Sequence, residues 1–445
     1  MAVLPHPLTQ WRAEFPILGR TTYLNSCSLG ALSRASRRRI EAHLDQWEMR
    51  GAANWYDSWW GDLESLRTRL ATLMGAGPGE VALHPSMSSI LGVIASALDT
   101  TARPRIVTTA LDFPTVPYQW LPRDVDLVIL ESPDGISVPL EAFEAAVNDR
   151  TALVITSHVY FTSGAIQDID GIAQIAARHG ALSFIDGYQG IGQLPVDVRR
   201  NGVDFYASGG LKWMLGGTGT TFLYARAETT HHLQPIASGW FAHRDQFAFD
   251  PRHFALHDDA RRFEAGTPPL MPVVAQLGGL DVLEAAGLDA IRMVTSALTE
   301  DLIAEARAVG LAPKVAATAA ERSAIVMLPS DDPRRDVARL AARYHGDIHR
   351  VGELRPETKL TLLERCDALR RPERFELILL ACEADYRGRM GWEERDYAQA
   401  AAWRATLAAV RGVDAGAIAL ATVDPKHIPA NVGKARVEAI KAASR

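Results

Sequence analysis

The sequence has little cysteine and no long apolar run. Its three cysteines, Cys27, Cys366 and Cys382, are too few and too widely spaced for a disulfide framework or a paired metal site. We interpret them as buried thiols in a reducing compartment. No apolar stretch reaches membrane-spanning length, and the N-terminus lacks the basic and then apolar pattern of a signal peptide. We therefore expect a cytoplasmic protein with no membrane partner.

A large excess of charge of one sign is also absent. The formal net charge is −6 over 445 residues, which predicts no bulk attraction to nucleic acid or to anionic membranes. The apolar fraction of 47% is that of an ordinary globular protein. A chain of this length has room for two or three domains and a large core.

Two short apolar segments place a carboxylate and an amine at predicted strand ends. Ala181–Ile185 is predicted to form a buried strand that ends at Asp186. Val203–Ala207 is predicted to form a second strand, and the glycine-rich loop after it carries a lone lysine, Lys212. This pair suits a cofactor that needs a covalent anchor and a charged partner. Pyridoxal 5′-phosphate (PLP) is such a cofactor, because an amine forms its Schiff base and a carboxylate keeps its ring nitrogen protonated.

The motifs around this pair resemble the core signature of class V PLP enzymes, a group with cysteine desulfurases, kynureninase and several aminotransferases and lyases. Lys212 or Asp186 alone would be interpreted as a surface or turn residue, but the ordered set of motifs favours a cofactor site. The resemblance implies that Lys212 anchors PLP, that Asp186 contacts the ring nitrogen, and that Gln189 hydrogen-bonds the phenolic oxygen. The motifs are Asp186-Gly-Tyr-Gln189, Pro195-Val-Asp-Val198, Gly202-Val-Asp-Phe205 and Gly210-Leu-Lys212-Trp-Met-Leu-Gly-Gly217.

A cluster of hydroxyl residues precedes the predicted helix Ile90–Leu98. Hydroxyl side chains cap helix starts, and the free amides there bind anions. Class V enzymes bind the PLP phosphate at this position, which implies contacts from Ser86, from the N–H of Met87, and from the N–H and hydroxyl of Ser88. Plain capping without phosphate is the alternative.

Two further predicted strands, Ile106–Ala110 and Ala152–Ser157, also end near polar or aromatic residues. Phe113 follows the first, in a Phe-Pro-Thr segment that resembles the kynureninase version, where an aromatic ring faces the cofactor. A core phenylalanine is the alternative. His158 follows the second and is a candidate for substrate binding. Strands that alternate with helices such as Gly171–His179 predict a parallel sheet with ligands at the carboxyl ends of its strands.

The sequence signals for substrate-binding residues are less specific than those for cofactor-binding residues. Asn25 lies in a Tyr-Leu-Asn segment that lines the substrate side in class V enzymes; an Asx-turn residue is the alternative. Phe161 and Thr162 depart from the family pattern, which often has an asparagine or a basic residue there. This departure leaves the substrate class open.

Two later segments resemble family segments that contribute to an active site shared between two subunits. Ser238-Gly-Trp240-Phe-Ala-His243 is similar to a segment of kynureninases. Thr267 lies in a Phe-Glu-Ala-Gly-Thr-Pro motif whose threonine, in the family, reaches the phosphate of the partner subunit. The resemblance therefore implies a homodimer with shared active sites, with Trp240, Thr267 and Ser208 as cofactor-binding residues. Without the resemblance, a threonine before a proline predicts only an extended backbone conformation at that residue.

The class V resemblance covers roughly residues 10–338 and stops before the arginine that binds the substrate carboxylate in the family. Arg350 and Arg355 lie nearby, but neither is in a recognisable strand. From about His345 the chain resembles the C-terminal helical region of bacterial tRNA nucleotidyltransferases, the CCA-adding enzymes. Apolar helical runs support a helical tail. The matching segments are His345–His349, Leu362–Leu369, Arg371–Phe375, Leu380–Arg389 and Val432–Ala439, and the runs are Phe375–Ala381 and Trp403–Val410.

We therefore predict an α/β protein of PLP fold type I, with a mostly parallel central sheet flanked by helices and an appended all-α C-terminal domain. The expected parts are an N-terminal segment (1–30), a PLP-binding large domain (31–245), a partial small domain (246–340) and a helical tail (341–445). The tail is interpreted as a solvated helical domain, with tRNA binding as the alternative.

The expected function is a PLP-dependent enzyme that acts on a small amino-acid substrate through Lys212. It would be a kynureninase-related lyase or hydrolase, or an aminotransferase. The alternative is a non-catalytic fusion, in which a class V fold without its substrate-binding arginine carries a tRNA-binding tail. No metal site is expected.

Overall fold

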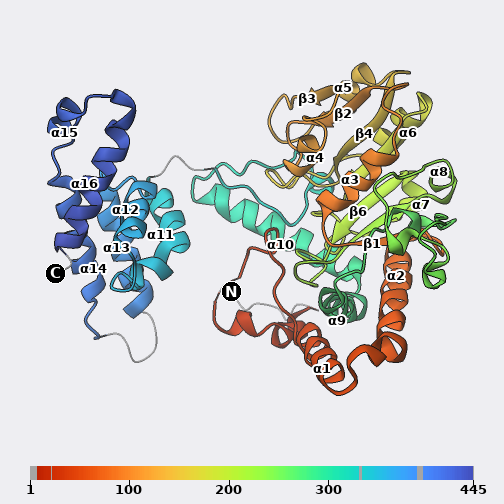
Figure 1. Ribbon diagram of the computed structural model, residues 1–445, viewed down its shortest axis with the longest axis horizontal. Coiled ribbons are helices and arrows are strands. Elements are labelled where there is room, and N and C mark those ends of the chain that lie inside the picture. Colours follow the sequence, from red (N-terminus) through yellow and green to blue (C-terminus); the bar gives the residue numbers. More distant parts are fainter. Residues whose placement is uncertain (1–7, 22, 330–332, 388–393, 444–445) are drawn as a thin grey trace. The chain divides into compact units, whose positions relative to one another are not determined.

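The computed structural model describes residues 8–21, 23–329, 333–387 and 394–443 (Figure 1). Its contacts divide the chain into two compact units, Met1–Pro329 and Ser330–Arg445. The second unit begins earlier than the predicted tail, because helix α11 (Pro333–His349) contributes to the core of that unit. The predicted three-part division of the first unit stays a prediction. Residues 388 and 389 of the predicted tail segment lie outside the described residues.

The first unit is built on a seven-stranded sheet of order β1-β7-β6-β5-β4-β2-β3. Strands β2 to β6 pair in parallel, whereas β7 is antiparallel to both β1 and β6. The predicted α/β fold with a mostly parallel sheet is confirmed. The strands are β1 (Val81–His84), β2 (Arg105–Thr109), β3 (Asp126–Leu130), β4 (Thr151–Ser157), β5 (Leu182–Asp186), β6 (Phe205–Gly209) and β7 (Thr221–Ala225).

Helices cover both faces of this sheet. On β4, Leu153 and Ile155 belong to the core cluster that contains the apolar face of α3, whereas Val154 belongs to the cluster that contains the apolar face of α6. Successive side chains of a strand point to opposite faces, so burial on both sides explains why this strand is a continuous apolar run. The helices of this unit are α1 (Arg34–Arg50), α2 (Trp60–Met74), α3 (Met87–Ala97), α4 (Thr115–Tyr118), α5 (Leu140–Ala146), α6 (Ile169–Arg178), α7 (Val198–Asn201), α8 (Ala227–Thr230), α9 (Leu270–Ala286) and α10 (Leu288–Ala308).

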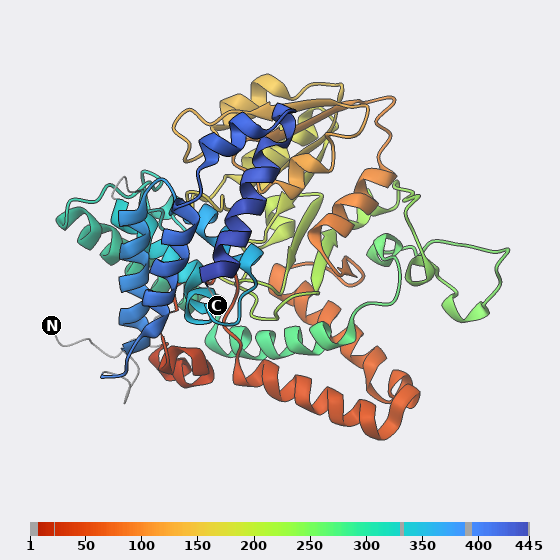
Figure 2. The same cartoon turned by 60° about the vertical axis from the view of Figure 1, so that its left-hand side comes forward.

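Helices α1 and α9 lie side by side although they are far apart in the sequence (Figure 2). The Ser36 hydroxyl donates to the carbonyl oxygen of Ala275 at 2.9 Å. A Cβ at Gly278 would clash with the backbone of Ser36, so glycine at this position permits the close approach of the two helices.

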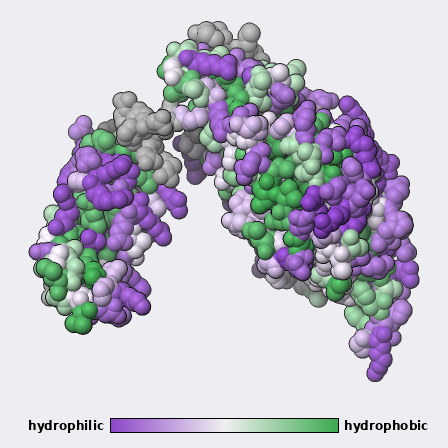
Figure 3. Space-filling view, turned by 90° about the horizontal axis from the view of Figure 1, so that it is seen from above, coloured by the Kyte–Doolittle hydropathy of each residue, from purple (hydrophilic) through white to green (hydrophobic). Residues whose placement is uncertain are grey.

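The part of the chain that the structure describes has no single helix long and apolar enough to cross a membrane. Helices α9 and α10 pass that test only as a pair, bent by 77°. Much of α9 is buried in the core of the first unit, as expected of a core helix. On the face that Figure 3 shows, hydrophilic residues predominate and apolar residues gather in separate patches.

The second unit is all-α in its described residues, as predicted. Its core is a cluster of apolar side chains from five helices, with Trp403 and Phe375 among the largest fully buried residues. Both apolar runs that predicted a helical tail lie inside helices, in α13 and α14. The helices are α11, α12 (Pro356–Arg365), α13 (Pro372–Arg387), α14 (Ala398–Arg411), α15 (Ala415–Ala421) and α16 (Ile428–Ala443).

Trp403 is expected to be essential to this core. Its indole N–H donates to the carbonyl oxygen of Ile348 at 3.0 Å, and its ring meets Phe375 edge to face at 5.9 Å. We expect Trp403→Ala to lower the free energy of unfolding of this unit by about 3–5 kcal/mol, because it leaves a cavity and an unpaired carbonyl. Chemical denaturation followed by circular dichroism measures the loss. Leu420→Ala, at a side chain that is 92% exposed, is the control and should change it by less than about 0.5 kcal/mol. Overlapping unfolding curves for Trp403→Ala and the natural protein would contradict this expectation.

Candidate active site

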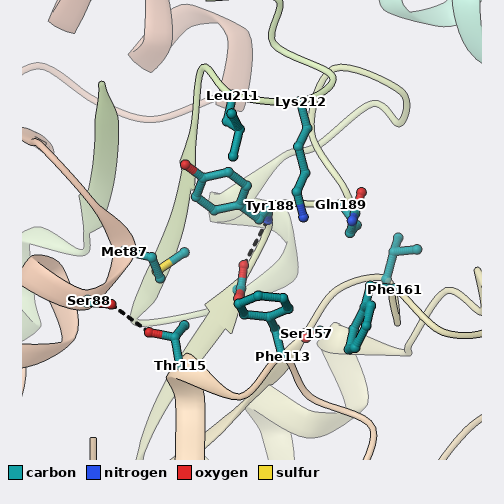
Figure 4. A pocket seen from close by; sticks show the side chains of 12 residues that line it. Met87, Ser88, Phe113, Thr115, Ser157, Phe161, Tyr188, Gln189, Leu211 and Lys212 are labelled. Atoms are coloured by element: carbon teal, nitrogen blue, oxygen red, sulfur yellow. Dashed lines mark hydrogen bonds between the residues drawn. The ribbon is translucent and has the colours of Figure 1, made fainter. Parts of the chain in front are cut away.

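A cavity of about 210 Å³ lies at the carboxyl ends of the central strands. This is where ligands bind in open α/β sheets. Figure 4 shows the Lys212 side chain pointing into the cavity, with Tyr188, Gln189 and Phe113 around it. The lining residues are Met87, Ser88, Phe113, Thr115, Ser157, Val159, Phe161, Asp186, Tyr188, Gln189, Leu211 and Lys212.

The loop that carries Lys212 is held tightly from the N-terminal side of the chain. The N–H of Gly30 donates to the carbonyl oxygen of Leu211 at 2.8 Å. A Cβ at Gly30 would clash with the carbonyl oxygen of Lys212, so only glycine fits here without a shift of the loop. Leu215, three residues after the lysine, has a φ of 60°, a left-handed conformation that is strained for leucine. The protein therefore maintains a strained turn next to its candidate catalytic amine.

The amine of Lys212 lies between two aromatic rings. Its Nζ is 5.3 Å from the centroid of Tyr188 and 5.6 Å from that of Phe113. Burial lowers the pKa of Lys212, and the nearby Asp186 and Cys27 oppose this shift. A lower pKa leaves a larger share of the amine neutral near pH 7. This is the form that attacks a carbonyl.

Asp186 is the last residue of β5 and is 5% exposed. Its Oδ1 accepts the backbone N–H of Tyr188 at 2.9 Å. Burial raises the pKa of Asp186 to about 6, while the Tyr188 amide and the Lys212 amine oppose the rise. A buried carboxylate of this kind is stabilised by a cationic N–H donor in the cavity, such as a protonated ring nitrogen.

The opposite side of the cavity is the N-terminus of α3. Ser86 caps this helix: its hydroxyl accepts the N–H of Ser89, whose hydroxyl accepts the N–H of Ser86 in return. Met87 and Ser88 are the first helical residues, whose N–H groups have no intrahelical acceptors. The hydroxyls of Ser88 and Thr115 are 2.7 Å apart. Two hydroxyls at a helix N-terminus form a suitable site for a phosphate.

The structure brings six predicted site residues together in the cavity. Gln189 is more constrained than the sequence suggested, because its Nε2 donates to the carbonyl oxygen of Cys27 at 2.8 Å and its Oε1 accepts the Trp213 indole N–H at 2.6 Å. A primary amide has two N–H donors, so one remains for a cofactor oxygen. The six residues are Met87, Ser88, Phe113, Asp186, Gln189 and Lys212.

Other predicted site residues do not line this cavity. The Nδ1 of His158 lies 3.0 Å from the hydroxyl of Tyr206, and the residue borders a separate cavity. Burial lowers the pKa of His158 to about 4, so the ring is neutral at pH 7. The hydroxyl of the buried Ser208 donates to the Gly187 carbonyl oxygen at 3.2 Å, and Ser86 serves as the helix cap. Within the chain these three residues contact neighbouring backbone and core groups, and their predicted roles toward cofactor or substrate stay predictions.

Asn25, Trp240 and Thr267 are exposed and do not line the cavity of the single chain. The Oδ1 of Asn25 accepts the thiol of Cys27 at 3.4 Å. The Trp240 indole N–H donates to the carbonyl oxygen of Gln246 at 2.7 Å. Their predicted contacts with substrate or cofactor stay predictions.

Sequence reasoning missed several lining residues. Tyr188, Thr115 and Leu211 lie inside motifs that were identified from the sequence, so those motifs contained the signal. Ser157 and Val159 have no distinguishing local pattern, because only the sheet topology places them at one edge.

The residues present fit PLP. An amine, a buried carboxylate, an aromatic ring and a hydroxyl-bearing helix N-terminus surround one cavity. These groups match the aldehyde, ring nitrogen, ring face and phosphate of this cofactor. Among the described residues, no group of His, Cys, Asp or Glu side chains could hold a metal ion.

Comparison with known proteins agrees with this chemistry. The family model for class V aminotransferases matches residues 61–343. The uncharacterized aminotransferase YcbU of Bacillus subtilis is 37% identical over 309 residues, 69% of this chain and 81% of that protein. Kynureninase of Pseudomonas fluorescens is 30% identical over 308 residues, 66% of this chain and 72% of that protein. A solved structure of C-DES, with glycine linked to its PLP cofactor, has a TM-score of 0.68 at 21% identity and covers 75% of this chain and 90% of that one.

A separate segment matches a different protein. The multifunctional CCA protein of Aromatoleum aromaticum is 58% identical over 108 residues, which are 24% of this chain but only 26% of that protein. The predicted resemblance of the tail is thereby confirmed, although the match spans only about a quarter of the relative. The family model and the pocket together indicate PLP as the cofactor. The chain belongs to the class V aminotransferase family and carries a segment similar to a CCA-adding protein.

Proposed function

We propose that this protein is a PLP-dependent enzyme that acts on an amino-acid-type substrate, either as a lyase or hydrolase related to kynureninase or as an aminotransferase. The observation that carries this proposal is the partly desolvated Lys212 amine in one cavity with the buried carboxylate of Asp186. PLP, when bound, supplies the electron sink that stabilises a carbanion on the substrate.

Each lining residue has a role in this proposal. Asp186 holds a proton on the ring nitrogen through its carboxylate. Lys212 would anchor the cofactor, and its amine would carry a proton to or from the α-carbon of the substrate. Ser88 and Thr115 bind the phosphate through their hydroxyls. Gln189 donates its remaining N–H to the phenolic oxygen.

Apolar residues form much of the remaining wall. Val159, Phe161 and Leu211 line the cavity together with Phe113, whose ring meets Phe161 edge to face at 5.4 Å. They exclude water from the reacting atoms. Exclusion of water strengthens the charge interactions of Asp186 and Lys212.

We further propose a homodimer whose active sites are shared. Trp240 and Thr267 are exposed in the single chain and are available to the cavity of a partner. Large apolar side chains near Trp240 are exposed as well, including Phe249 at 73% and Phe247 at 54%. Exposed apolar patches are typical of interaction sites.

A spectroscopic titration tests the proposed reaction. We expect the purified protein to be yellow, and its visible band to change when its amino-acid substrate is added from a panel that contains kynurenine, cysteine and alanine. The twelve described residues that line the cavity of the single chain include no arginine, so this lining offers no guanidinium to orient a substrate carboxylate. We therefore expect only weak turnover of ordinary α-amino acids.

The same titration separates the alternatives. A protein that binds PLP but gives no spectral response to any amino acid would support the non-catalytic fusion. Arg350 and Arg355 both lie in the second unit, where Arg350 pairs with Asp347 at 3.0 Å. Robust turnover that is lost in Arg350→Ala or Arg355→Ala would show that one of them replaces the missing arginine.

A further inference from the structure

We propose that Asp112, which does not line the cofactor cavity, is a positioning residue for the reaction. Its carboxylate joins the ends of β2 and β4, and thereby fixes the cavity side chains that follow both strands. The inference rests on the proposed PLP-dependent function and deepens it, because it assigns the rigidity of the site to one buried group.

The carboxylate of Asp112 accepts five hydrogen bonds. Its Oδ2 accepts the N–H and the hydroxyl of Thr109 and the hydroxyl of Thr108, each at 2.9 Å. Its Oδ1 accepts the N–H of Ser157 at 2.6 Å and the hydroxyl of Thr156 at 3.1 Å. The residue is only 6% exposed. Burial raises the pKa of Asp112, and the hydrogen bonds from Ser157, Thr109 and Thr108 oppose this rise because they favour the ionised, acceptor-only carboxylate.

These hydrogen bonds take the place of backbone hydrogen bonds between β2 and β4. The parallel pairing of β2 with β4 extends only to Val107 and Val154. Beyond these residues, Thr108 and Thr109 of β2 and Thr156 and Ser157 of β4 each donate to Asp112. The carboxylate therefore joins two strand ends where backbone pairing between them has stopped.

The joined ends carry the walls of the cavity. Phe113 and Thr115 lie one and three residues after Asp112, while Ser157 ends β4 and Phe161 lies four residues beyond it. The edge-to-face contact of Phe113 with Phe161 joins the segments that follow the two strands, and the Thr115 hydroxyl lies 2.7 Å from that of Ser88 on α3. Loss of the link would let the two walls move apart.

The link continues to the neighbouring strand. The N–H of His158, next to Ser157, donates to the carbonyl oxygen of Asp186 at 2.9 Å. Burial is the main cause of the raised pKa of Asp186, and the negative charge of Asp112 raises it further. Asp112 is therefore close enough to act on the candidate partner of the ring nitrogen, both through backbone contacts and through charge.

Asparagine cannot replace this carboxylate without loss. The backbone N–H groups of Thr109 and Ser157 approach different oxygens of Asp112, and neither can become an acceptor. An asparagine has one oxygen and one NH₂ group. In either orientation, its NH₂ group would face one of these N–H groups and leave a buried donor unsatisfied.

The test compares Asp112→Asn with a matched control at the other end of the sheet. Asp204 accepts the N–H and hydroxyl of Ser183 at 2.9 and 3.0 Å and the hydroxyl of Thr229 at 2.8 Å, and so joins the starts of β5 and β6. We expect Asp112→Asn to weaken PLP binding to the apoprotein by about tenfold or more and to shift the visible band. Asp204→Asn should lower the melting temperature but leave the PLP dissociation constant within about twofold.

Fluorescence quenching of the apoprotein by PLP gives the dissociation constant without any activity measurement. If Asp112→Asn does not fold, Thr156→Val removes a single donor and should weaken binding in the same direction, by a few-fold. The inference would be overturned if the folded Asp112→Asn and Thr156→Val variants bound PLP with the natural affinity and showed the natural visible absorption band. An equal loss of PLP affinity in Asp204→Asn would also overturn it. Failure of the natural protein to bind PLP would instead refute the proposed function.

Discussion

Replacing Lys212 by alanine should abolish the covalent attachment of PLP that borohydride reduction makes permanent. Lys212 is the only lysine among the residues that line the cavity, and its pKa is lowered by burial. Turnover should fall by about 10²–10⁴-fold, the usual contribution of a positioned acid–base group. Cofactor held by the helix N-terminus and Asp186 should remain, but it should be lost on dialysis.

The scarcity of lysine makes this experiment decisive. The chain has six lysines, and Lys212 and Lys314 are the only two in the first unit. Lys314→Ala is the matched control and should keep the reducible adduct and its yellow colour. Peptide mapping of the reduced protein should place the label on Lys212. A label on Lys314 or on a lysine of the second unit would refute the assignment. The full set is Lys212, Lys314, Lys359, Lys426, Lys434 and Lys441.

Asp186→Asn should separate cofactor binding from turnover. The N–H of Tyr188 requires an acceptor, so the asparagine oxygen should stay with it and the NH₂ group should face the cavity. An NH₂ group can donate to an unprotonated ring nitrogen but cannot keep that nitrogen protonated. We therefore expect PLP to bind in part, while turnover falls by about a hundred- to a thousandfold, as expected of an interaction that is strongest in the transition state.

Two measurements check this prediction. The PLP dissociation constant of the apoprotein reports binding, and the rate at saturating substrate reports turnover. Asp204→Asn, which removes a carboxylate at the opposite end of the same strand pair, is the control and should turn over at nearly the natural rate. Near-natural turnover in Asp186→Asn would show that the carboxylate does not hold the ring-nitrogen proton.

The local sequence pattern was sufficient to predict the strands that carry the candidate site. The predicted strand Ala181–Ile185 corresponds to β5, and Val203–Ala207 corresponds to β6, each displaced by one or two residues. Apolar runs bounded by glycine and polar residues are local signals, and the ends of elements are their least certain part. Helices α13 and α14 of the second unit were predicted for the same reason, since the runs Phe375–Ala381 and Trp403–Val410 are apolar and lie inside them.

The sequence by itself determined the order of these elements and the motifs around Lys212 and Asp186. It also determined that the first part of the chain resembles class V PLP enzymes and that the tail resembles CCA-adding enzymes. Only the tertiary structure decided that α11 joins the core of the second unit, that His158 contacts Tyr206 outside the cavity, and that Leu211 lies in the cavity wall. The reason is that a side chain's environment depends on partners distant in the sequence. Tyr206 is 48 residues from His158, and the Asp112 carboxylate meets Ser157 from a strand 45 residues away. Such contacts leave no periodic signal in the chain, because they arise only when the sheet brings its strand ends together.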